Sequence, residues 1–290
     1  MAIPIKAIRQ PQVSGQFYPQ DPAELSLVLN QFLSQPAEKL KVRALVVPHA
    51  GYVFSGQVAG SAFAYLKNQK YKKIILIGPS HYYSFAGLAV DNHHAYQTPL
   101  GKVLVSDRVN DLLKEKNFKQ KPEAFEPEHD LEVELPFLQK VLSGFEIIPL
   151  LMGSENSLSD IREMAAIMKK YYDPQTLIVV SADFTHYGPN FGFKPFTKDI
   201  PQNLTKLDDP VIDFLTAGQT EKLYDYLHQV AVTNDGQNVL PWLAEIAKDQ
   251  KLSAKVAARD TSGNITGDYE NSVSYASLVF YPAPLLSNKN

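Results

Sequence analysis

One stretch decides the fold of this chain: Ala44-Leu45-Val46-Val47-Pro48-His49-Ala50-Gly51-Tyr52. Its first four residues are apolar and include two β-branched valines, which is typical of a buried parallel strand. Pro48 has no N–H to donate, so the strand should end there, and Gly51 allows the backbone to turn sharply. Ser55 can cap a helix over residues 56–67, whose apolar residues share one face. The stretch therefore predicts a strand, a histidine, a turn and a helix.

The same pattern occurs twice more. Residues 73–81 form an apolar strand that ends in Gly78-Pro79-Ser80-His81, and residues 177–186 form one that leads into Asp183 and His186. Three of the seven histidines thus follow the three strands that we expect at the centre of a sheet. Ligands bind at the carboxyl edge of open α/β sheets, so we expect these histidines to share a site.

Strands and helices alternate along the chain, which predicts a single three-layer α/β domain, residues 1–290, with a mixed, mostly parallel central sheet flanked by helices. Residues 1–20 should be an extended N-terminal segment, and residues 282–290 a frayed tail. Residues 188–203 read as an aromatic-rich loop that is long enough to be a lid. The remaining helices are expected at residues 21–35, 107–117, 128–142 (with a kink at Pro136 or a start nearer Glu134), 159–172, 209–216, 220–229 and through Trp242 and Ile246. The remaining strands are expected at residues 88–90, 101–106, 146–152, 256–259 and 272–281, and a further loop at residues 122–127.

Composition narrows the function classes. A hydrophobic content of 44% with 20% charged residues is ordinary for a globular protein. The net charge of -3 gives no reason to expect nucleic acid or a membrane as a partner. The chain has no cysteine, which excludes disulfides, thiolate metal sites and cysteine nucleophiles. It also has no apolar signal segment and no run of transmembrane length. We therefore expect a cytoplasmic enzyme or binding protein.

Metal binding is the first chemistry that these residues support. Two imidazoles and one carboxylate on one face make the facial triad of non-haem Fe(II) enzymes. His49 and His81 are the natural imidazole pair, because each closely follows a central strand. His186 could complete a set of three histidines or act as an acid/base beside the metal. Spacing does not fix the carboxylate, for which these residues compete: Asp183, Asp235, Glu128, Asp130 and Asp268.

Other chemistries have weaker support. Ser181, Asp183 and His186 are the residue types of a hydrolytic triad, but their local spacing is not a triad signature. The chain has no nucleophile elbow, P-loop or dinucleotide-binding fingerprint. We expect His93 and His94 to lie in a solvated turn, and His228 to interact with the end of a helix.

Five motifs occur in a fixed order: Pro48-His49-Ala50-Gly51-Tyr52, Gly78-Pro79-Ser80-His81, Glu128-His129-Asp130-Leu131-Glu132, Ser181-Ala182-Asp183-Phe184-Thr185-His186-Tyr187-Gly188 and Ser272-Val273-Ser274-Tyr275-Ala276. Together they resemble the Memo family, also called AmmeMemoRadiSam system protein B. The resemblance runs from Gly15-Gln16-Phe17-Tyr18-Pro19 to Phe280, which is nearly the whole chain.

That family is similar to class III extradiol ring-cleaving dioxygenases, which hold Fe(II) by two histidines and one carboxylate. The resemblance implies the same fold and implies that His49 and His81 are metal ligands. It also implies that His186 is the acid/base, that His129 lines the pocket and that Asp183 orients its neighbours.

The third ligand position departs from the animal members of the family. They have a cysteine in an Ile-Cys-Gly segment, whereas this chain has Asn234-Asp235-Gly236. A carboxylate in place of a thiolate shifts preference from copper or zinc towards Fe(II) or Mn(II). We expect Asp235 to complete the triad with His49 and His81. The alternative is that Asp235 caps the helix that follows it.

Two function classes follow from the resemblance. The first is a Fe(II)-dependent oxidoreductase of dioxygenase type. The second is a signalling adaptor that binds a phosphorylated or anionic peptide in the histidine-lined pocket, as animal Memo proteins are described. Phe17, Tyr18, Tyr52 and Tyr187 would form aromatic walls in both. The family association also implies a radical SAM protein as a partner in a modification system, and the ligand is an unidentified small molecule or peptide.

Overall fold

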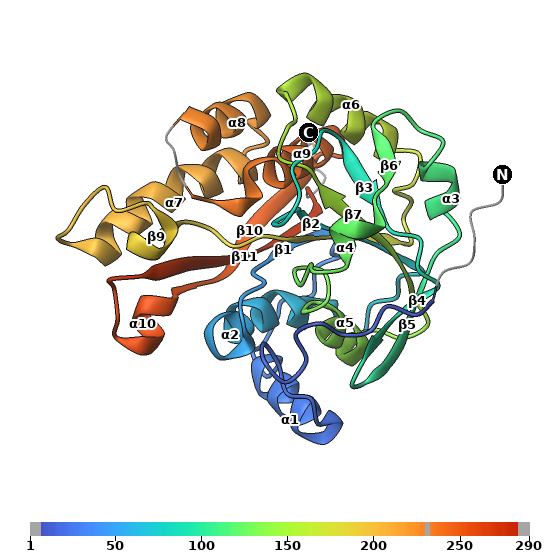
Figure 1. Ribbon diagram of the computed structural model, residues 1–290, viewed down its shortest axis with the longest axis horizontal. Coiled ribbons are helices and arrows are strands. Elements are labelled where there is room, and N and C mark those ends of the chain that lie inside the picture. The colour runs from blue at the N-terminus through green and yellow to red at the C-terminus, as the bar shows by residue number, and fades with distance from the viewer. Residues whose placement is uncertain (1–6, 230–232, 284–290) are drawn as a thin grey trace, which may run out of the picture.

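The computed structural model describes residues 7–229 and 233–283 (Figure 1). Residues 1–6 and 284–290, which belong to the predicted N-terminal segment and tail, lie outside the described residues. Within the described part, one large sheet carries helices on both faces. The predicted α/β class with three layers is confirmed.

The strands are β1 (Ala44–Val47), β2 (Lys73–Pro79), β3 (Leu88–Val90), β4 (Ala95–Thr98), β5 (Gly101–Val105), β6 (Phe118–Gln120), β7 (Glu146–Met152), β8 (Thr176–Ser181), β9 (His186–Tyr187), β10 (Leu252–Thr261) and β11 (Ser272–Pro282). The α-helices are α1 (Pro22–Phe32), α2 (Tyr52–Phe63), α3 (Val109–Leu112), α4 (Pro122–Phe125), α5 (Leu135–Val141), α6 (Leu158–Met168), α7 (Ile200–Thr216), α8 (Thr220–Gln229), α9 (Val239–Asp249) and α10 (Ser262–Thr266). Short 3-10 helices are η1 (Ala64–Leu66), η2 (Pro189–Phe191) and η3 (Asp235–Gln237).

The strand order explains why the three histidine-bearing strands meet. The order is β10-β11-β1-β8-β2-β7-β3-β6. The central strands β1, β8, β2 and β7 run parallel, whereas β11 and β3 pair with them in the antiparallel sense. Val47 pairs with Ser181, and Ile77 pairs with Val180, so β1, β8 and β2 end at nearly the same level. Their carboxyl ends therefore form one edge.

The central strands are buried on both faces, and two apolar cores result. In β1, Val46 belongs to one core, and Leu45 and Val47 belong to the other, as the two-residue period of a strand requires. Helices α6, α8 and α9 lie on one side of the sheet and α1, α2 and α5 on the other (Figure 1). Trp242 of α9 is fully buried in the first core. Because helices cover both faces of the sheet, a binding site that is open to solvent can form only at its edges.

Helix starts agree only partly with the predictions. Asp21 caps α1 as expected, because its carboxylate accepts two backbone N–H groups of the first turn. Ser55 does not cap a helix that begins at residue 56. Helix α2 already begins at Tyr52, and the Ser55 hydroxyl donates to the carbonyl of Ala50 from within the first turn. Gly51 is the N-cap at φ -54°, so the turn does not need the left-handed conformation that favours glycine.

Three other boundaries differ from the predictions. The helix expected over residues 107–117 is reduced to α3, and Asn117 adopts a left-handed φ of 68°. The loop expected over residues 122–127 contains the helical turn α4. Helix α7 begins at Ile200 instead of residue 209, so Pro210 lies inside it. Proline is compatible with helical φ and removes one hydrogen bond, which a well-packed helix of this length tolerates.

Residues 128–134 do not form the beginning of the predicted helix. They form turns, and α5 starts after them with Pro136 in its first turn. The acidic side chains of these turns are buried, with exposed fractions of 2% or less: Glu128, Asp130, Glu132 and Glu134. A buried charge needs a partner, and Glu132 has Arg9 at 2.9 Å. The N-terminal segment is thereby fixed to the turns.

No helix within the described residues is long and apolar enough to cross a membrane.

Candidate metal centre

The histidines come together at the carboxyl edge of the sheet. His49 follows β1, His81 follows β2 and Asp183 follows β8, each at the second residue after the strand. Because β8 lies between β1 and β2, these side chains meet above the middle of the sheet. The ring centroids of His49 and His81 are 5.1 Å apart.

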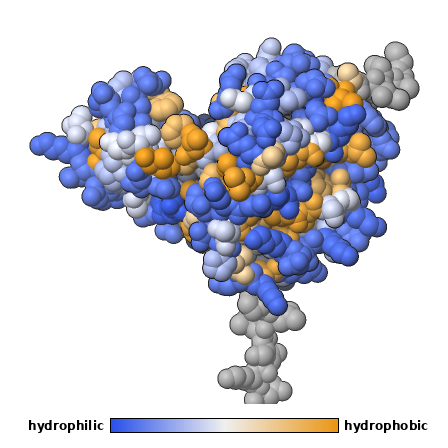
Figure 2. All heavy atoms as spheres, turned by 90° about the horizontal axis from the view of Figure 1, so that it is seen from below, coloured by the Kyte–Doolittle hydropathy of each residue, from blue (hydrophilic) through white to orange (hydrophobic). Residues whose placement is uncertain are grey.

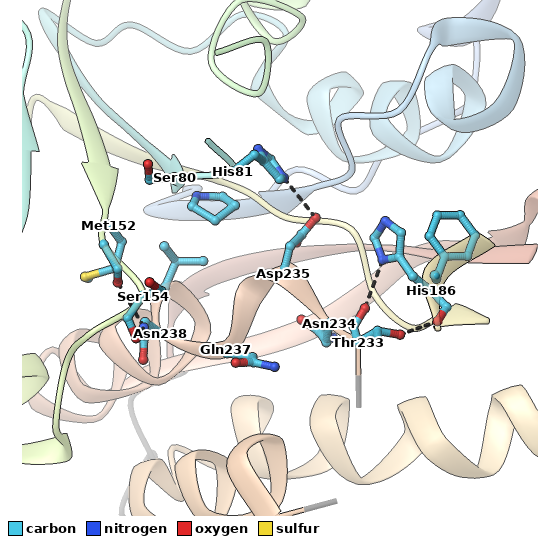
Figure 3. Close-up of a pocket in the computed structure, with 14 residues that line it drawn as sticks. Ser80, His81, Met152, Ser154, His186, Thr233, Asn234, Asp235, Gln237 and Asn238 are labelled. Atoms are coloured by element: carbon cyan, nitrogen blue, oxygen red, sulfur yellow. Dashed lines mark hydrogen bonds and ion pairs between the residues drawn. The ribbon is translucent and has the colours of Figure 1, made fainter. Parts of the chain in front are cut away.

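Asp235 reaches the two rings from η3. Its Oδ2 atom lies 3.0 Å from His49 Nε2 and 3.5 Å from His81 Nε2. Figure 3 shows the contact with His81. Ligand atoms that are about 2.1 Å from a metal ion and at right angles to each other lie about 3 Å apart, so this spacing suits a metal. Asp235 does not serve as a cap. Asn234 has that position, and its side-chain oxygen accepts the N–H of Gly236.

The carboxylate of Asp235 is poorly satisfied by the protein. Both oxygens are buried, and neither receives a well-aligned hydrogen bond from a described residue, although the imidazoles lie close. Burial alone would raise the pKa of Asp235, but the facing imidazoles hold it well below its usual range. Burial lowers the pKa of His81, yet Asp235 and Glu128 outweigh this effect and raise it to about 11. An ionised carboxylate beside two imidazoles fits a cation, which would take the place of the proton that His81 carries without metal.

The imidazole rings of His49 and His81 each have a polar partner at Nδ1, the nitrogen that does not face Asp235. Ser181 Oγ lies 3.0 Å from His49 Nδ1, and Glu128 Oε1 lies 2.8 Å from His81 Nδ1. Contacts of this kind hold a proton on Nδ1, so that Nε2 is the nitrogen that would face a metal; on His81 the metal would displace the second proton, which the metal-free ring keeps because of its raised pKa. Glu128, one of the candidate ligands, therefore lies behind His81 and orients it.

Asp183 and His129 are the other side chains that surround the site. Asp183 Oδ1 accepts the backbone N–H of His49 at 2.9 Å, and burial raises its pKa to about 6. The ring of His129 packs 5.1 Å from that of His81 and 5.5 Å from that of His49. His49, His81 and His129, and separately His49, Asp183 and Asp235, can each bring three ligand atoms within 4.8 Å of one another.

His186 lies outside these ligand groups of the described residues. Its Nδ1 atom is 3.0 Å from the carbonyl oxygens of both Phe184 and Thr233, so Nδ1 carries the proton and donates it. The Nε2 atom then keeps its lone pair. The ring packs 5.0 Å from that of Phe191. This tautomer can accept a proton at Nε2.

Two cavities flank the centre. The outer cleft, of about 580 Å³, lies between the start of α2 and α10 and is lined by Phe17, Val53, Phe54, His129, Val273 and Tyr275 among others. The inner cavity, of about 370 Å³, is lined by Ser80, Met152, Ser154, Asn234, Asp235 and Asn238 among others. His81, His186 and Phe191 line both. Figure 2 shows apolar side chains on both sides of a hollow between the lobe on the left and the main body.

The predicted aromatic walls are only partly present. Phe17 lines the outer cleft, and its ring is 4.9 Å from that of His129. Tyr18, Tyr52 and Tyr187 line neither cavity, because they are buried and their hydroxyls donate to acceptors inside the protein: Glu132, the Val133 carbonyl and the Phe196 carbonyl respectively. Phe54, Phe191 and Tyr275 supply aromatic surface that the sequence patterns did not predict.

The remaining candidate carboxylates are Asp130 and Asp268. Asp130 is fully buried against Gly78, and burial raises its pKa well above the usual range. It forms a third possible ligand group with His81 and Glu128. Asp268 lines the outer cleft.

The remaining histidines, His93, His94 and His228, line neither cavity. His93 does not lie in a solvated turn as predicted: its side chain is mostly buried, and Nδ1 lies 2.8 and 2.9 Å from the two oxygens of Asp91. His94 is exposed. His228 is exposed near the end of α8, as expected, and its Nδ1 bonds the carbonyl of Tyr224.

Sequence reasoning missed Glu134. Its Oε1 atom lies 3.0 Å from Ser181 Oγ, the same hydroxyl that contacts His49. Glu134 is fully buried, and burial raises its pKa well above the usual range, which favours the protonated acid. Its only signal in the sequence was its place two residues after the acid-rich motif of residues 128–132.

Comparisons with known proteins show the family of this chain. Residues 9–279 match the family model of Memo-like proteins. A MEMO1 family protein of Aquifex aeolicus is 31% identical, with 94% of this chain and 99% of that protein covered. A MEMO1 family protein of Thermoplasma volcanium is 30% identical, with 94% and 98% covered. A solved structure of an uncharacterized protein from Escherichia coli K12 has a TM-score of 0.52 and 14% identity over 82% of this chain and 99% of that one, which shows the fold alone. This chain belongs to the Memo family.

Proposed function

We propose that this protein is a non-haem metal-dependent oxidoreductase of dioxygenase type, with Fe(II) bound by His49, His81 and Asp235. One observation carries the proposal. Asp235 Oδ2 lies 3.0 and 3.5 Å from the Nε2 atoms of the two histidines, and the carboxylate lacks well-aligned hydrogen bonds from described residues. Two imidazoles and one carboxylate with open positions are typical of non-haem Fe(II) oxygenases, and the hard oxygen ligand favours Fe(II) or Mn(II).

The surrounding residues have distinct tasks. Bound iron supplies Lewis acidity and redox capacity toward oxygen. Ser181 and Glu128 orient the two rings, and Asp183 fixes the backbone of His49. His186 lines both cavities with Nε2 unprotonated, so it accepts a proton from substrate and returns it to product.

The lining of the cavities does not favour the adaptor alternative. A phosphorylated peptide needs arginine or lysine to pair with its phosphate. Among the described residues, no lysine or arginine lines the outer cleft or the inner cavity. His81 is the one described group on these walls with a pKa raised to about 11, and its positive charge is paired with Asp235 and Glu128, whereas Asp183 and Asp268 would repel a phosphate.

The test is elemental analysis of protein purified without oxygen and loaded with Fe(II). We expect about one iron ion per chain, lost in His49→Ala and Asp235→Ala and retained in the matched control His228→Ala. Wild-type protein without metal after loading, or unchanged metal in both site variants, would remove the proposed function.

A further inference from the structure

Ser181, the last residue of β8, is fully buried and has three polar neighbours. Its Oγ atom lies 2.9 Å from the carbonyl oxygen of Asp130, 3.0 Å from Glu134 Oε1 and 3.0 Å from His49 Nδ1. Buried polar groups are almost always hydrogen-bonded in folded proteins, so each of these contacts needs a proton. The number of protons that the group contains decides the protonation state of Glu134.

A serine hydroxyl carries one proton and two lone pairs, so it donates one hydrogen bond and accepts up to two. The carbonyl oxygen of Asp130 can only accept, so the contact of 2.9 Å uses the hydroxyl proton of Ser181. The two lone pairs of Oγ then face Glu134 and His49. Both of these neighbours must therefore donate, His49 from Nδ1 and Glu134 from Oε1. A glutamic acid side chain can donate only when it is protonated.

An ionised Glu134 does not fit the same contacts. Its carboxylate and the Asp130 carbonyl would both be acceptors, and the single proton of the Ser181 hydroxyl cannot serve both. The second oxygen, Glu134 Oε2, is buried without a partner among the described residues. Leaving a charged oxygen in this position is far more costly than leaving the carbonyl oxygen of a neutral acid there. Burial also raises the pKa of Glu134, in agreement with the proton count.

The start of α5 would favour a charged Glu134, but the side chain does not use it. Glu134 is the N-cap residue of this helix. A carboxylate at such a position is stabilised when it accepts N–H groups of the first turn. The Glu134 side chain makes no capping hydrogen bond and contacts Ser181 instead. The helix therefore does not supply the donors that an ionised Glu134 would need.

We propose that Glu134 is a positioning residue of the metal centre and keeps its proton in the native state. The protonated carboxyl donates to Ser181 Oγ, the Ser181 hydroxyl donates to the Asp130 carbonyl, and the remaining lone pair of Oγ accepts the Nδ1 proton of His49. Ser181 is thereby held by three hydrogen bonds, and His49 Nε2 is kept toward Asp235. This inference rests on the proposed function only for the statement that His49 binds a metal.

A donor at Glu134 acts on His49 because Ser181 lies between the two residues. With an apolar residue in place of Glu134, Oγ loses one of its three partners, and the serine side chain can rotate away from His49. Loss of the partner that orients a metal-binding imidazole typically costs about 10- to 100-fold in metal affinity. A change one contact farther away should cost about tenfold, at the lower end of this range.

Infrared difference spectroscopy tests the proton directly. Wild-type protein and Glu134→Gln are compared without metal at neutral pH, and the subtraction removes the bands of other buried acids such as Asp130. We expect the wild type to show the C=O stretching band of a protonated carboxylic acid that Glu134→Gln lacks. The band should shift in Ser181→Ala, because the carboxyl loses its acceptor. A difference spectrum without this band would overturn the inference.

Two variants separate the donor from the size of the side chain. Glu134→Gln supplies an N–H donor in place of the O–H, and Glu134→Leu supplies none at a similar volume. We expect Glu134→Gln to keep the wild-type affinity for Fe(II) and, in the metal-free protein, the slowly exchanging Nδ1 proton of His49 in NMR spectra. Glu134→Leu should lose this signal and bind Fe(II) about tenfold more weakly. Wild-type affinity in Glu134→Leu, or equal losses in both variants, would contradict the positioning role.

Ser181→Ala provides the matched background, because Glu134 is proposed to act only through Ser181. In that background Glu134→Leu should cause no further loss of affinity for Fe(II), and an additive loss would refute the proposed chain of contacts. The two proposals also fail separately. The infrared band and the Nδ1 signal in a protein that takes up no iron would refute the oxidoreductase and leave the contacts of Glu134, Ser181 and His49 standing. Stoichiometric iron in a protein without the band would do the reverse.

Discussion

Ser181 Oγ lies 3.0 Å from His49 Nδ1, across the parallel pairing of β8 with β1. The strand beside β1 thus sets which nitrogen of His49 carries the proton. The hydroxyl also bonds the carbonyl of Asp130 at 2.9 Å, so its own direction is fixed. The pairing of β8 with β1 therefore fixes the orientation of the His49 ring, which is one of the proposed metal ligands.

Ser181→Ala should lower the affinity for Fe(II) about 10- to 100-fold, because the ring of His49 loses the contact that fixes its tautomer. Competition with a chromophoric chelator measures this. The control is Ser277→Ala, which removes a buried hydroxyl of β11 that lines neither cavity. Equal losses in both variants would show a general loosening of the sheet instead.

His186→Gln should keep its metal, since His186 lies outside the ligand groups. Turnover of a substrate should fall about 10²- to 10⁴-fold through loss of the acid/base. Elemental analysis checks the first expectation without need of a substrate. A variant that loses iron as His49→Ala does would make His186 a ligand.

Glu134→Gln should make stability less dependent on pH. Burial raises the pKa of Glu134, so the native state binds a proton that the unfolded state releases above about pH 4.3. Its stabilising contribution is complete below that pH and is lost as pH rises through the folded pKa, at about 1.4 kcal/mol per pH unit. Glutamine resembles the protonated acid and removes this loss. Urea denaturation from pH 5 to pH 8 should therefore show the variant gaining on wild type; parallel curves would refute a raised pKa of Glu134 in the native state.

Gly78→Ala should destabilise the protein by about 3 kcal/mol through overpacking. A Cβ atom at this position would lie 1.7 Å from Asp130 Oδ2, which is buried and cannot move into solvent. Gly51→Ala is the control, because its Cβ would meet ordinary contacts of 3.7 Å at a permitted φ. Urea denaturation of both variants measures their free energies of unfolding. Equal values for Gly78→Ala and Gly51→Ala would mean that the Asp130 side chain moves aside at little cost.

Local sequence predicted the parts of the fold that depend on neighbours in sequence. Apolar runs ended by Pro48 and by Gly78-Pro79 located β1 and β2, because a short buried strand has few alternatives. Asp21 and the proline after it located α1 for the same reason. The histidines at these strand ends could therefore be grouped into one site from sequence alone.

The parts that were mispredicted depend on distant partners. Residues 128–134 have a helical apolar spacing, yet Arg9, Tyr18 and Ser181 draw their carboxylates into the interior. No pattern within the segment shows those contacts. The tyrosines expected to line the site are buried for a similar reason, since acceptors such as Glu132 and the Val133 carbonyl come from these turns.

The pairing of β1 with β11 also bears on biosynthesis. Ala44 pairs with Phe280, and Val46 pairs with Leu278, so β1 gains its second neighbour only after residue 280 has been made. Asp235 likewise arrives long after His49. On a ribosome that adds about 5 to 20 residues per second, the earlier strands wait more than about ten seconds with this edge unpaired. Such an edge is a template for misassociation, so nascent chains of this protein should depend on chaperones until the last strand closes the sheet.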